Sequence, residues 1–323
     1  MTRIFHDDDA DLRDLDGQRV VVVGYGNQGR SWALNLRDSG LPVRVCVRAD
    51  HTRRRAAEDG FAVEEIEAAG DADILCVLVP DDAIPALPLT PGPHTLTVVA
   101  SGYTLAWDRF DPPGDVGMIA PRMLGPEVRR CYEEGVGYIT AVGVHRDATG
   151  RAWPRLLAIA KAIGGLARGG IELTPKQEAL LDLSVEQLLS PALTHVNQAF
   201  VMTMLSHGIP MEAVMTELYL SGEVERNYRL LREVGFVGQL ELHSPTSQYG
   251  QLSRRGAYDA LDVAARMRAL ADDIESGRFA EEWDAESRAG HPRLKALKDQ
   301  HAGPAIRAME EEIRRKLAGP DAD

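Results

Sequence analysis

The sequence predicts an α/β fold with a doubly wound parallel sheet in its first half and an all-α second half. Three observations predict it. The apolar run Val20–Val23 leads directly into Gly24-x-Gly26-x-x-Gly29. Short apolar runs then alternate with amphipathic segments up to residue 173. From there on, helical periodicity replaces these runs. We therefore expect a Rossmann-type dinucleotide-binding domain over 1–173 and an all-helical domain over 174–323.

Each element follows from a local pattern. The valine run is apolar on both faces, as the strands of a parallel sheet are. A helix is expected to follow over 30–37 and to stop at Ser39-Gly40. Thr174 can cap a helix that has Pro175 in its first turn. Further strands are expected at 42–48, 72–79, 95–100, 116–120 and 138–144, and helical segments near 178–206, 210–235, 257–276 and 293–317.

Composition and charge exclude several classes of function. The 323 residues carry a net charge of −13, which disfavours nucleic acid and anionic membranes as partners. Cys46, Cys76 and Cys131 lie far apart without metal-ligand spacing, so we expect buried, reduced thiols. The N-terminal residues lack the apolar core of a signal peptide, and no apolar run reaches membrane-spanning length. We therefore expect a cytoplasmic protein.

The glycines after the first strand predict a dinucleotide site. They let the backbone approach a pyrophosphate, and the helix that follows supplies N–H groups and positive potential at its start. A tight turn without a ligand can show the same glycine pattern, but the strand–turn–helix context favours the dinucleotide. The candidate residues are Gly24, Tyr25, Gly26, Asn27, Gln28 and Gly29.

The end of the second strand bears on the choice of cofactor. An acidic residue there binds the ribose of NAD, but this chain has Arg48, with Thr52 and Arg53 close behind. Arginines suit the 2′-phosphate of NADP(H), so we expect NADP(H) rather than NAD(H). Asp50 in the same loop leaves NAD(H) open, and a solvated basic helix start is the other interpretation of the later arginines.

An acidic pair stands out in the helical half. Asp182 and Glu186 are four residues apart among leucines, a spacing that places both carboxylates on one face of a helix. Buried like charges are costly unless a cation offsets them, and carboxylate oxygens suit Mg²⁺. A solvated acidic stripe is the alternative. Glu217 and Glu223 are similar candidates from another segment.

Further motifs are spread along the chain. They include Ala120-Pro121, Tyr132-Glu-Glu-Gly135, Asp182-Leu-Ser-Val-Glu-Gln187, Ser244-Pro-Thr-Ser-Gln-Tyr-Gly250 and Ile274-Glu-Ser-Gly-Arg-Phe-Ala-Glu-Glu-Trp283. With the glycine turn, their order and spacing resemble the ketol-acid reductoisomerases of the shorter, bacterial type over nearly the whole chain.

The resemblance implies a reaction in two steps. Mg²⁺ ions assist an alkyl migration in a 2-hydroxy-2-alkyl-3-oxo acid such as acetolactate, and NADPH then reduces the new 2-oxo group. This is a step of branched-chain amino acid biosynthesis. The resemblance also implies a homodimer or larger homo-oligomer with shared active sites in the helical domain. Asp182 would bridge two Mg²⁺ ions, Glu186 would complete one site, the partner subunit's Glu217 would reach in, and Ser244 would hold the substrate carboxylate.

Three positions depart from the family pattern. Ser101 stands where the family has histidine, and Arg122 stands where it has a catalytic lysine. Ser221 replaces the second glutamate of the pair that Glu217 begins. Serine lacks the proton chemistry of imidazole near neutral pH, and arginine keeps a charge but cannot shuttle a proton. We count Ser101 and Arg122 with Asp182 and Glu186 as the candidate catalytic residues.

Three hypotheses follow from these departures. We favour a divergent NAD(P)H-dependent oxidoreductase that reduces a small 2-oxo acid or a related C=O or C=N compound, with the alkyl migration lost or altered. The second hypothesis is a true ketol-acid reductoisomerase that converts acetolactate to 2,3-dihydroxyisovalerate. The third is a catalytically silent nucleotide-binding protein.

Overall fold

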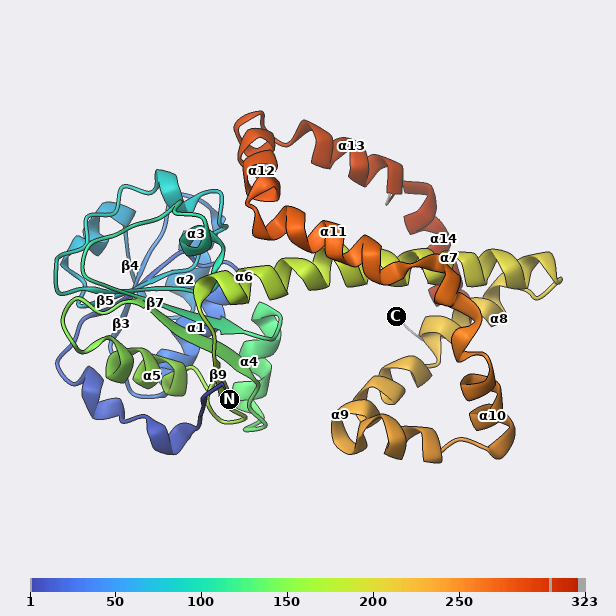
Figure 1. Ribbon diagram of the computed structural model, residues 1–323. Coiled ribbons are helices and arrows are strands. Elements are labelled where there is room, and N and C mark those ends of the chain that lie inside the picture. Colours follow the sequence, from blue (N-terminus) through green and yellow to red (C-terminus); the bar gives the residue numbers. More distant parts are fainter. Residues whose placement is uncertain (1, 302–303, 319–323) are drawn as a thin grey trace. The chain divides into compact units, whose positions relative to one another are not determined.

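The computed structural model describes residues 2–301 and 304–318, and the chain divides into an N-terminal unit, 1–182, and a C-terminal unit, 183–323. Figure 1 shows the sheet of the N-terminal unit, in which β3, β4, β5, β7 and β9 are labelled. The first turns of α6 (Pro175–Ser184) belong to the N-terminal unit, and the expected domain boundary at 173 stays a prediction.

The N-terminal unit contains one sheet, whose order is β1-β9-β8-β7-β6-β5-β2-β3-β4 in the described residues. Its strands are β1 (Ile4–Phe5), β2 (Val20–Val23), β3 (Val43–Cys46), β4 (Ala62–Glu64), β5 (Ile74–Val77), β6 (Leu96–Val99), β7 (Asp115–Pro121), β8 (Thr140–Arg146) and β9 (Gly170–Glu172). The chain order reverses between β2 and β5, as in doubly wound sheets that bind ligands at this switch point.

The sheet is parallel from β4 to β7, as expected, but not throughout. β8 runs antiparallel to β7, with Ile119 opposite Val142, and β1 runs antiparallel to β9. The chain leaves β7, forms α4 (Gly125–Glu133) and re-enters the sheet from the same end, which reverses the direction of β8. The short strands β1, β4 and β9 were not predicted, because two or three residues are too few to show a period.

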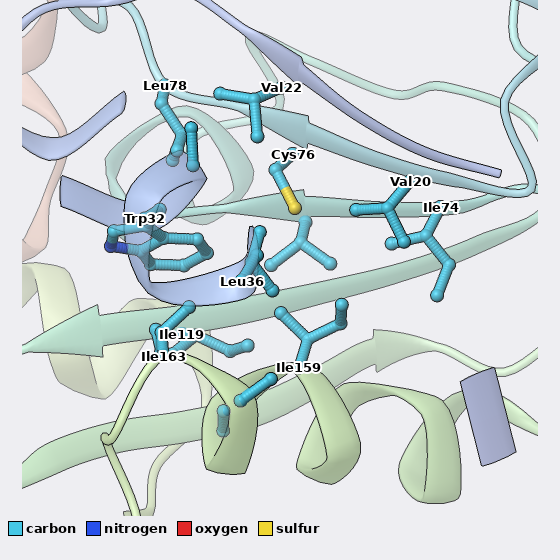
Figure 2. Packing of buried hydrophobic residues seen from close by; sticks show 14 of the residues in the cluster. Val20, Val22, Trp32, Leu36, Ile74, Cys76, Leu78, Ile119, Ile159 and Ile163 are labelled. Carbon is cyan, nitrogen blue, oxygen red and sulfur yellow. The ribbon is translucent and has the colours of Figure 1, made fainter. Parts of the chain in front are cut away.

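Two apolar clusters cover the faces of this sheet. On one face α1 (Asn27–Asp38), α2 (His51–Glu58) and α5 (Ala152–Ala162) pack on the strands. Figure 2 shows Trp32, Leu36 and Ile159 within this cluster. The other face is covered by short 3₁₀ turns and by α3 (Tyr103–Ala106). The free cysteines are buried, as expected, and burial raises the pKa of Cys46 to about 11.

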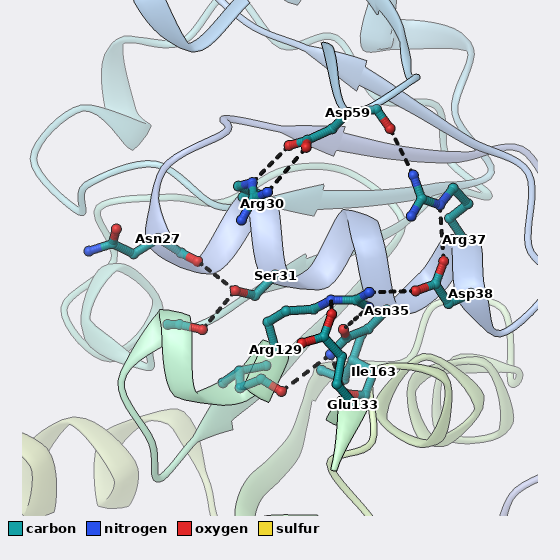
Figure 3. Close-up of polar contacts among 12 residues, drawn as sticks. Asn27, Arg30, Ser31, Asn35, Arg37, Asp38, Asp59, Arg129, Glu133 and Ile163 are labelled. Carbon is teal, nitrogen blue, oxygen red and sulfur yellow. Dashed lines mark hydrogen bonds and ion pairs between the residues drawn. The ribbon is translucent and has the colours of Figure 1, made fainter. Parts of the chain in front are cut away.

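Polar contacts fix α1 against its neighbours (Figure 3). The buried side chain of Asn35 donates to the carbonyl of Ile163 at 3.0 Å and accepts from Arg129 Nη1 at 2.9 Å. Arg30 on the same helix pairs with Asp59 at 2.7 Å. These contacts hold the helix that follows the glycine turn, so the turn itself has a rigid support.

The C-terminal unit is helical. Its α-helices are α7 (Ser190–Ser206), α8 (Met211–Met215), α9 (Glu223–Glu241), α10 (Pro245–Ser253), α11 (Val263–Glu275), α12 (Arg278–Arg288), α13 (Pro292–His301) and α14 (Pro304–Ala318). α10 and α12 were not predicted, and α9 is kinked at Gly235. π-Helical turns over Val185–Leu189 and Thr216–Leu220 precede α7 and α9. In the described part of the chain, no helix is both long and apolar enough to span a membrane.

Candidate functional site

The glycine turn after β2 shows why each glycine is needed. Gly24 has a φ of +95°, and a Cβ there would lie 2.6 Å from the carbonyl oxygen of Leu78. A Cβ on Gly29 would lie 2.2 Å from the carbonyl oxygen of Gly24. Around Gly26, in contrast, nothing lies within 4 Å of such a Cβ. Packing therefore explains two of the glycines, and the third opens onto space that a ligand can use.

A cleft of about 940 Å³ adjoins this turn. It lies beyond the carboxyl ends of β2, β3 and β5, at the switch point of the sheet. Five predicted cofactor residues line it: Gly24, Tyr25, Gly26, Arg48 and Thr52. The segment after β5, which was not among the predicted site residues, also lines the cleft, with Val79, Pro80, Asp82, Ala83 and Ala86. The Pro-Asp-Asp turn that closes β5 was the available signal.

The other predicted cofactor residues do not line the cleft. Gln28 donates to the carbonyl of Met123 at 3.3 Å, so it ties the start of α1 to the segment after β7. Gly29 serves the close turn, and Arg53 pairs with Glu65. Asn27 is the first residue of α1, and a Cβ on Gly125 would lie 2.5 Å from its carbonyl carbon. These residues support the turn in the described structure.

The basic side of the cleft is formed at the start of α2. Asp50 caps this helix, accepting from the Thr52 backbone N–H at 2.8 Å and from its hydroxyl at 2.5 Å. These hydrogen bonds lower the pKa of Asp50. Arg48 lies exposed in the lining and makes no ion pair with any described residue. With Asp50 engaged in capping, Arg48 is a cationic side chain of the lining that can meet an adenosine ribose or its phosphate.

A second cluster, formed by Arg122, Glu178 and Asp182, lies at the same edge of the sheet. Arg122 follows β7 directly, and its Nη1 donates to Glu178 Oε1 at 2.8 Å. Its Nη2 donates to Asp182 Oδ1. The Glu178 side chain is 1% exposed, and burial raises its pKa although Arg122 and a backbone N–H oppose this. Glu178 was not among the residues predicted from the sequence. The pattern that could have identified it is an acid four residues before Asp182 in an apolar segment.

Glu178 also holds the loop that carries Ser101. Its Oε2 accepts from the Gly102 backbone N–H at 2.6 Å. A Cβ on Gly102 would lie 2.2 Å from the carbonyl oxygen of Pro175, so only glycine lets α6 approach this loop. The Ser101 hydroxyl accepts from the Tyr103 N–H at 3.1 Å. Within the N-terminal unit, the structure thus brings Ser101, Arg122 and Asp182 together.

The carboxylates available do not fit Mg²⁺ at Asp182 in this arrangement. One of its oxygens accepts from the Arg122 guanidinium, which already supplies a positive charge. No group of three or more His, Cys, Asp or Glu among residues 2–301 and 304–318 is placed to hold a metal ion. The metal role of Asp182 stays a prediction and would require this ion pair to open.

The remaining predicted residues belong to the C-terminal unit, and their roles stay predictions. Glu186 lies in the π-helical turn Val185–Leu189 and Glu217 in the turn Thr216–Leu220. Such turns are rare and are found frequently at functional sites. The hydroxyl oxygen of Ser244 accepts from the Ser247 N–H at 3.3 Å and caps α10, which leaves its proton free to bind an anion.

Comparisons with known proteins cover both units. Residues 14–170 match the family model for the acetohydroxy acid isomeroreductase NADPH-binding domain, and residues 176–318 match the ketol-acid reductoisomerase C-terminal domain. The ketol-acid reductoisomerase (NADP(+)) of Caldivirga maquilingensis is 37% identical over 98% of this chain and 99% of its own length. The ketol-acid reductoisomerase (NAD(P)(+)) of Metallosphaera sedula is 36% identical over 98% of this chain and 96% of its own.

A solved structure agrees with these matches. An NADH-preferring ketol-acid reductoisomerase from an uncultured archaeon has a TM-score of 0.89 and 29% identity, covering 97% of this chain and 98% of that one. Because both halves match one family along nearly their whole length, the chain belongs to the ketol-acid reductoisomerase family, in its short form, and is an oxidoreductase.

Proposed function

We propose that this protein is an NAD(P)H-dependent reductase of a small 2-oxo acid, or of a related C=O or C=N compound, which has lost the alkyl migration of its family. The observation that carries the proposal is the double contact of Arg122 with Glu178 and Asp182. It places a permanent cation on the carboxylate that the family resemblance assigns to Mg²⁺.

Alkyl migration makes demands that this site meets poorly. The substrate hydroxyl must lose its proton, and a full metal set must hold the alkoxide while the carbon group moves. An arginine guanidinium is always charged in proteins, so Arg122 cannot accept that proton. Ser101 cannot replace an imidazole in proton transfer near neutral pH. Reduction of a carbonyl needs only a positioned hydride donor and a polarised oxygen. Loss of the proton-handling groups therefore affects migration first.

The residues present can serve the reduction. A bound dihydronicotinamide cofactor would supply the hydride. The two contacts of Arg122 engage one donor on each terminal nitrogen of a guanidinium that has five N–H donors. The remaining donors can bind the oxygen of a carbonyl or carboxylate group. The Ser101 hydroxyl can donate to the same substrate, since its oxygen already accepts from Tyr103.

We further propose that the preferred cofactor is NADPH. Arg48 supports this preference, since it lines the cleft without an ion-pair partner among the described residues, and Asp50 is engaged in capping α2. The relatives differ in this respect: the names of two mention NADP(+) or NAD(P)(+), and the solved one is described as NADH-preferring. The choice therefore depends on residues of each chain.

We also propose that the chain acts as a homodimer or larger homo-oligomer. A stripe of exposed apolar side chains follows the π turn onto α7: Leu189, Leu193, Val196 and Phe200. Their spacing of three and four residues places them on one side of a helix. A long exposed stripe of this kind is typical of an interface. The net charge of −13 makes nucleic acid an unfavourable partner.

A true ketol-acid reductoisomerase is the second candidate, and one observation favours it. Glu186 and Glu217, the acids that the family resemblance assigns to Mg²⁺, each lie in a π-helical turn. If these acids bind Mg²⁺ and Asp182 leaves Arg122, the protein could carry out both steps on acetolactate.

NADPH oxidation assays separate the two candidates. The purified protein is given hydroxypyruvate, 2-oxopantoate or acetolactate, each with Mg²⁺ and with a chelator. We expect turnover of a 2-oxo acid and none of acetolactate in either condition. Turnover of acetolactate that depends on Mg²⁺ would establish the second candidate instead. Oxidation of NADPH with none of these substrates would leave the silent nucleotide-binding protein.

A further inference from the structure

We propose that Arg122 takes the place of a divalent metal ion: its guanidinium closes the Asp182 carboxylate to Mg²⁺ and itself polarises the substrate oxygen. The reduction then needs no divalent cation. This inference rests on the proposed function, because it describes how the same site would activate a carbonyl group.

The positive charge of Arg122 lies between two carboxylates. Glu178 and Asp182 are four residues apart on α6, and Arg122 donates to both carboxylates. A single guanidinium thus neutralises much of the charge that would attract Mg²⁺. A divalent cation bound to Asp182 would stand next to a positive group that cannot release its proton. A lysine at this position could lose its proton or swing away on its flexible stem, but an arginine held at two points does neither easily.

The guanidinium of Arg122 is firmly held. Glu178 is almost fully buried, and its two oxygens are both engaged, one by Arg122 and one by the Gly102 N–H at 2.6 Å. The backbone N–H of Arg122 donates to the carbonyl of Ile139 at 2.9 Å. If Arg122 moved to admit a metal ion, it would leave a buried carboxylate without its cation, which is costly. The contact with Asp182 is therefore the resting arrangement of the site.

The Arg122 guanidinium is also accessible. The Arg122 side chain is 30% exposed, whereas that of Glu178 is 1% exposed, so the guanidinium is fixed on its buried side and open on the other. Met123, the next residue, accepts from Gln28 in the helix that follows the glycine turn. Arg122 follows the carboxyl end of β7, and the dinucleotide cleft lies at the carboxyl ends of β2, β3 and β5 in the same sheet, although Arg122 does not line that cleft. A substrate oxygen can reach the remaining N–H donors of Arg122 from its open side.

The reduction balances without a metal ion. Hydride, with its electron pair, adds to the carbonyl carbon, and the C=O π electrons move to the oxygen. The dihydronicotinamide is oxidised to the pyridinium form. Solvent water supplies the proton that completes the alcohol, and Arg122 stabilises the developing negative charge by hydrogen bonds while keeping its own protons.

Titration with Mn²⁺, followed by electron paramagnetic resonance, tests the proposal independently of activity. The full-length protein is compared with Arg122→Gln and with Arg44→Gln. Arg44, which lies on β3, is the matched control because it also contacts two carboxylates, those of Glu64 and Asp71. We expect weak Mn²⁺ binding by the unaltered protein and by Arg44→Gln. Arg122→Gln should bind Mn²⁺ at least about tenfold more tightly, and adding Asp182→Asn should abolish this gain.

Two results would overturn the proposal. One is Mn²⁺ binding that is already tight in the unaltered protein, or that Arg122→Gln does not strengthen. The other is NADPH oxidation with a 2-oxo acid that a chelator abolishes. If Arg122→Gln fails to fold, the titration and the chelator experiment on the unaltered protein still decide. If no 2-oxo acid is reduced, the proposed function fails, while the Mn²⁺ titration still shows whether Arg122 excludes metal ions.

Discussion

The N-terminal unit buries its large apolar side chains between strands and helices, whereas the C-terminal unit leaves many of its own exposed. Trp32, Leu36 and Ile159 are fully buried in the first unit (Figure 2). In the second, only Val214, Ile274, Ala280 and Ile313 among the described hydrophobic residues are buried. Val196 is 58% exposed and Met202 is 67% exposed. The first unit buries its large apolar side chains within one chain, whereas the second has exposed apolar surfaces that a further chain could cover.

The same contrast holds for the functional residues. Those of the N-terminal unit are fixed by contacts within it, such as the Gly102–Glu178 hydrogen bond and the Arg122–Glu178 ion pair. Those of the C-terminal unit, Glu186 and Glu217, lie in π-helical turns on elements with little buried surface. The effects of substitutions in the first unit should therefore be independent of protein concentration, whereas the effects of substitutions in the second should depend on it.

The most damaging single change should be Asp115→Asn, because Asp115 is fully buried and pairs with the buried Arg155. It also accepts from the N–H groups of Ala148 and Thr149 at 2.7 and 2.9 Å. Leaving Arg155 unpaired should cost about 3–5 kcal/mol of the free energy of unfolding. Urea unfolding of the N-terminal unit, monitored by its tryptophans, measures this loss. A loss that varied with protein concentration would contradict the self-sufficiency of this unit.

Asp115 also predicts an effect of pH. Burial acts to raise its pKa, but the hydrogen bonds from Thr149 and Arg155 outweigh it and hold the pKa below 3.8. A lowered pKa gives stability that is present above pH 3.8 and is lost as the pH falls through the folded-state value. Asp115→Asn should therefore show a shallower loss of stability in acid than the unaltered protein. Parallel acid profiles would rule out this contribution.

Gly26→Val should have the second-largest effect, and it should weaken NADPH binding without destabilising the fold. A Cβ at Gly26 meets no atom within 4 Å apart from its chain neighbours, so we expect little change in the melting temperature. The same side chain would occupy the approach to the cleft, and NADPH affinity should fall about 100-fold, or about 2.7 kcal/mol. Calorimetric titration with NADPH measures this effect. If affinity persists, the open space beside Gly26 is not the cofactor site.

Val196→Asp should affect assembly. It puts a charge into the exposed apolar stripe on α7 and should weaken self-association at least about tenfold, because an apolar contact becomes a buried charge. Gln198→Asp adds the same charge to the same helix outside the stripe, so it is the control. Sedimentation velocity over a range of concentrations compares them. Equal behaviour of the two variants would remove the stripe from the interface.

Arg48→Ala should have the smallest effect, a fall of about tenfold in NADPH affinity with little change for NADH. Arg53→Ala is the control, since Arg53 pairs with Glu65 and does not line the cleft. Competition binding with the two nucleotides gives both values. An equal fall for NADH and NADPH would show that Arg48 does not meet a 2′-phosphate.

Local patterns were enough to predict much of the N-terminal unit. The buried run of β2, the glycine turn and the start of α6, where Thr174 and Gln177 cap each other, depend on neighbours in sequence. The antiparallel direction of β8 could not be predicted, because a strand that follows a helix has the same sequence pattern whether it runs parallel or antiparallel to its neighbour. Arg53 was predicted as a cofactor ligand because its ion pair with Glu65 forms only in the folded loop and cannot be recognised from the local sequence.

The acidic cluster shows the same limit at the site. Asp182 was a candidate from its spacing, but its contact with Arg122 joins residues 60 positions apart, and no local pattern reports such a contact. Glu178 was missed because a single acid in an apolar segment resembles a surface residue until its partners are known. Its partners, Gly102 and Arg122, come from the ends of two separate strands.

One comparison of substrates decides whether migration is lost. Acetolactate requires an alkyl shift before reduction, whereas 3-hydroxy-3-methyl-2-oxobutanoate is the product of that shift and requires reduction alone. NADPH oxidation is measured with each acid at saturating Mg²⁺. We predict oxidation with the shifted acid and none with acetolactate. Equal rates with the two acids would show that the site with Arg122 and Ser101 still moves the alkyl group, and would contradict the proposed function.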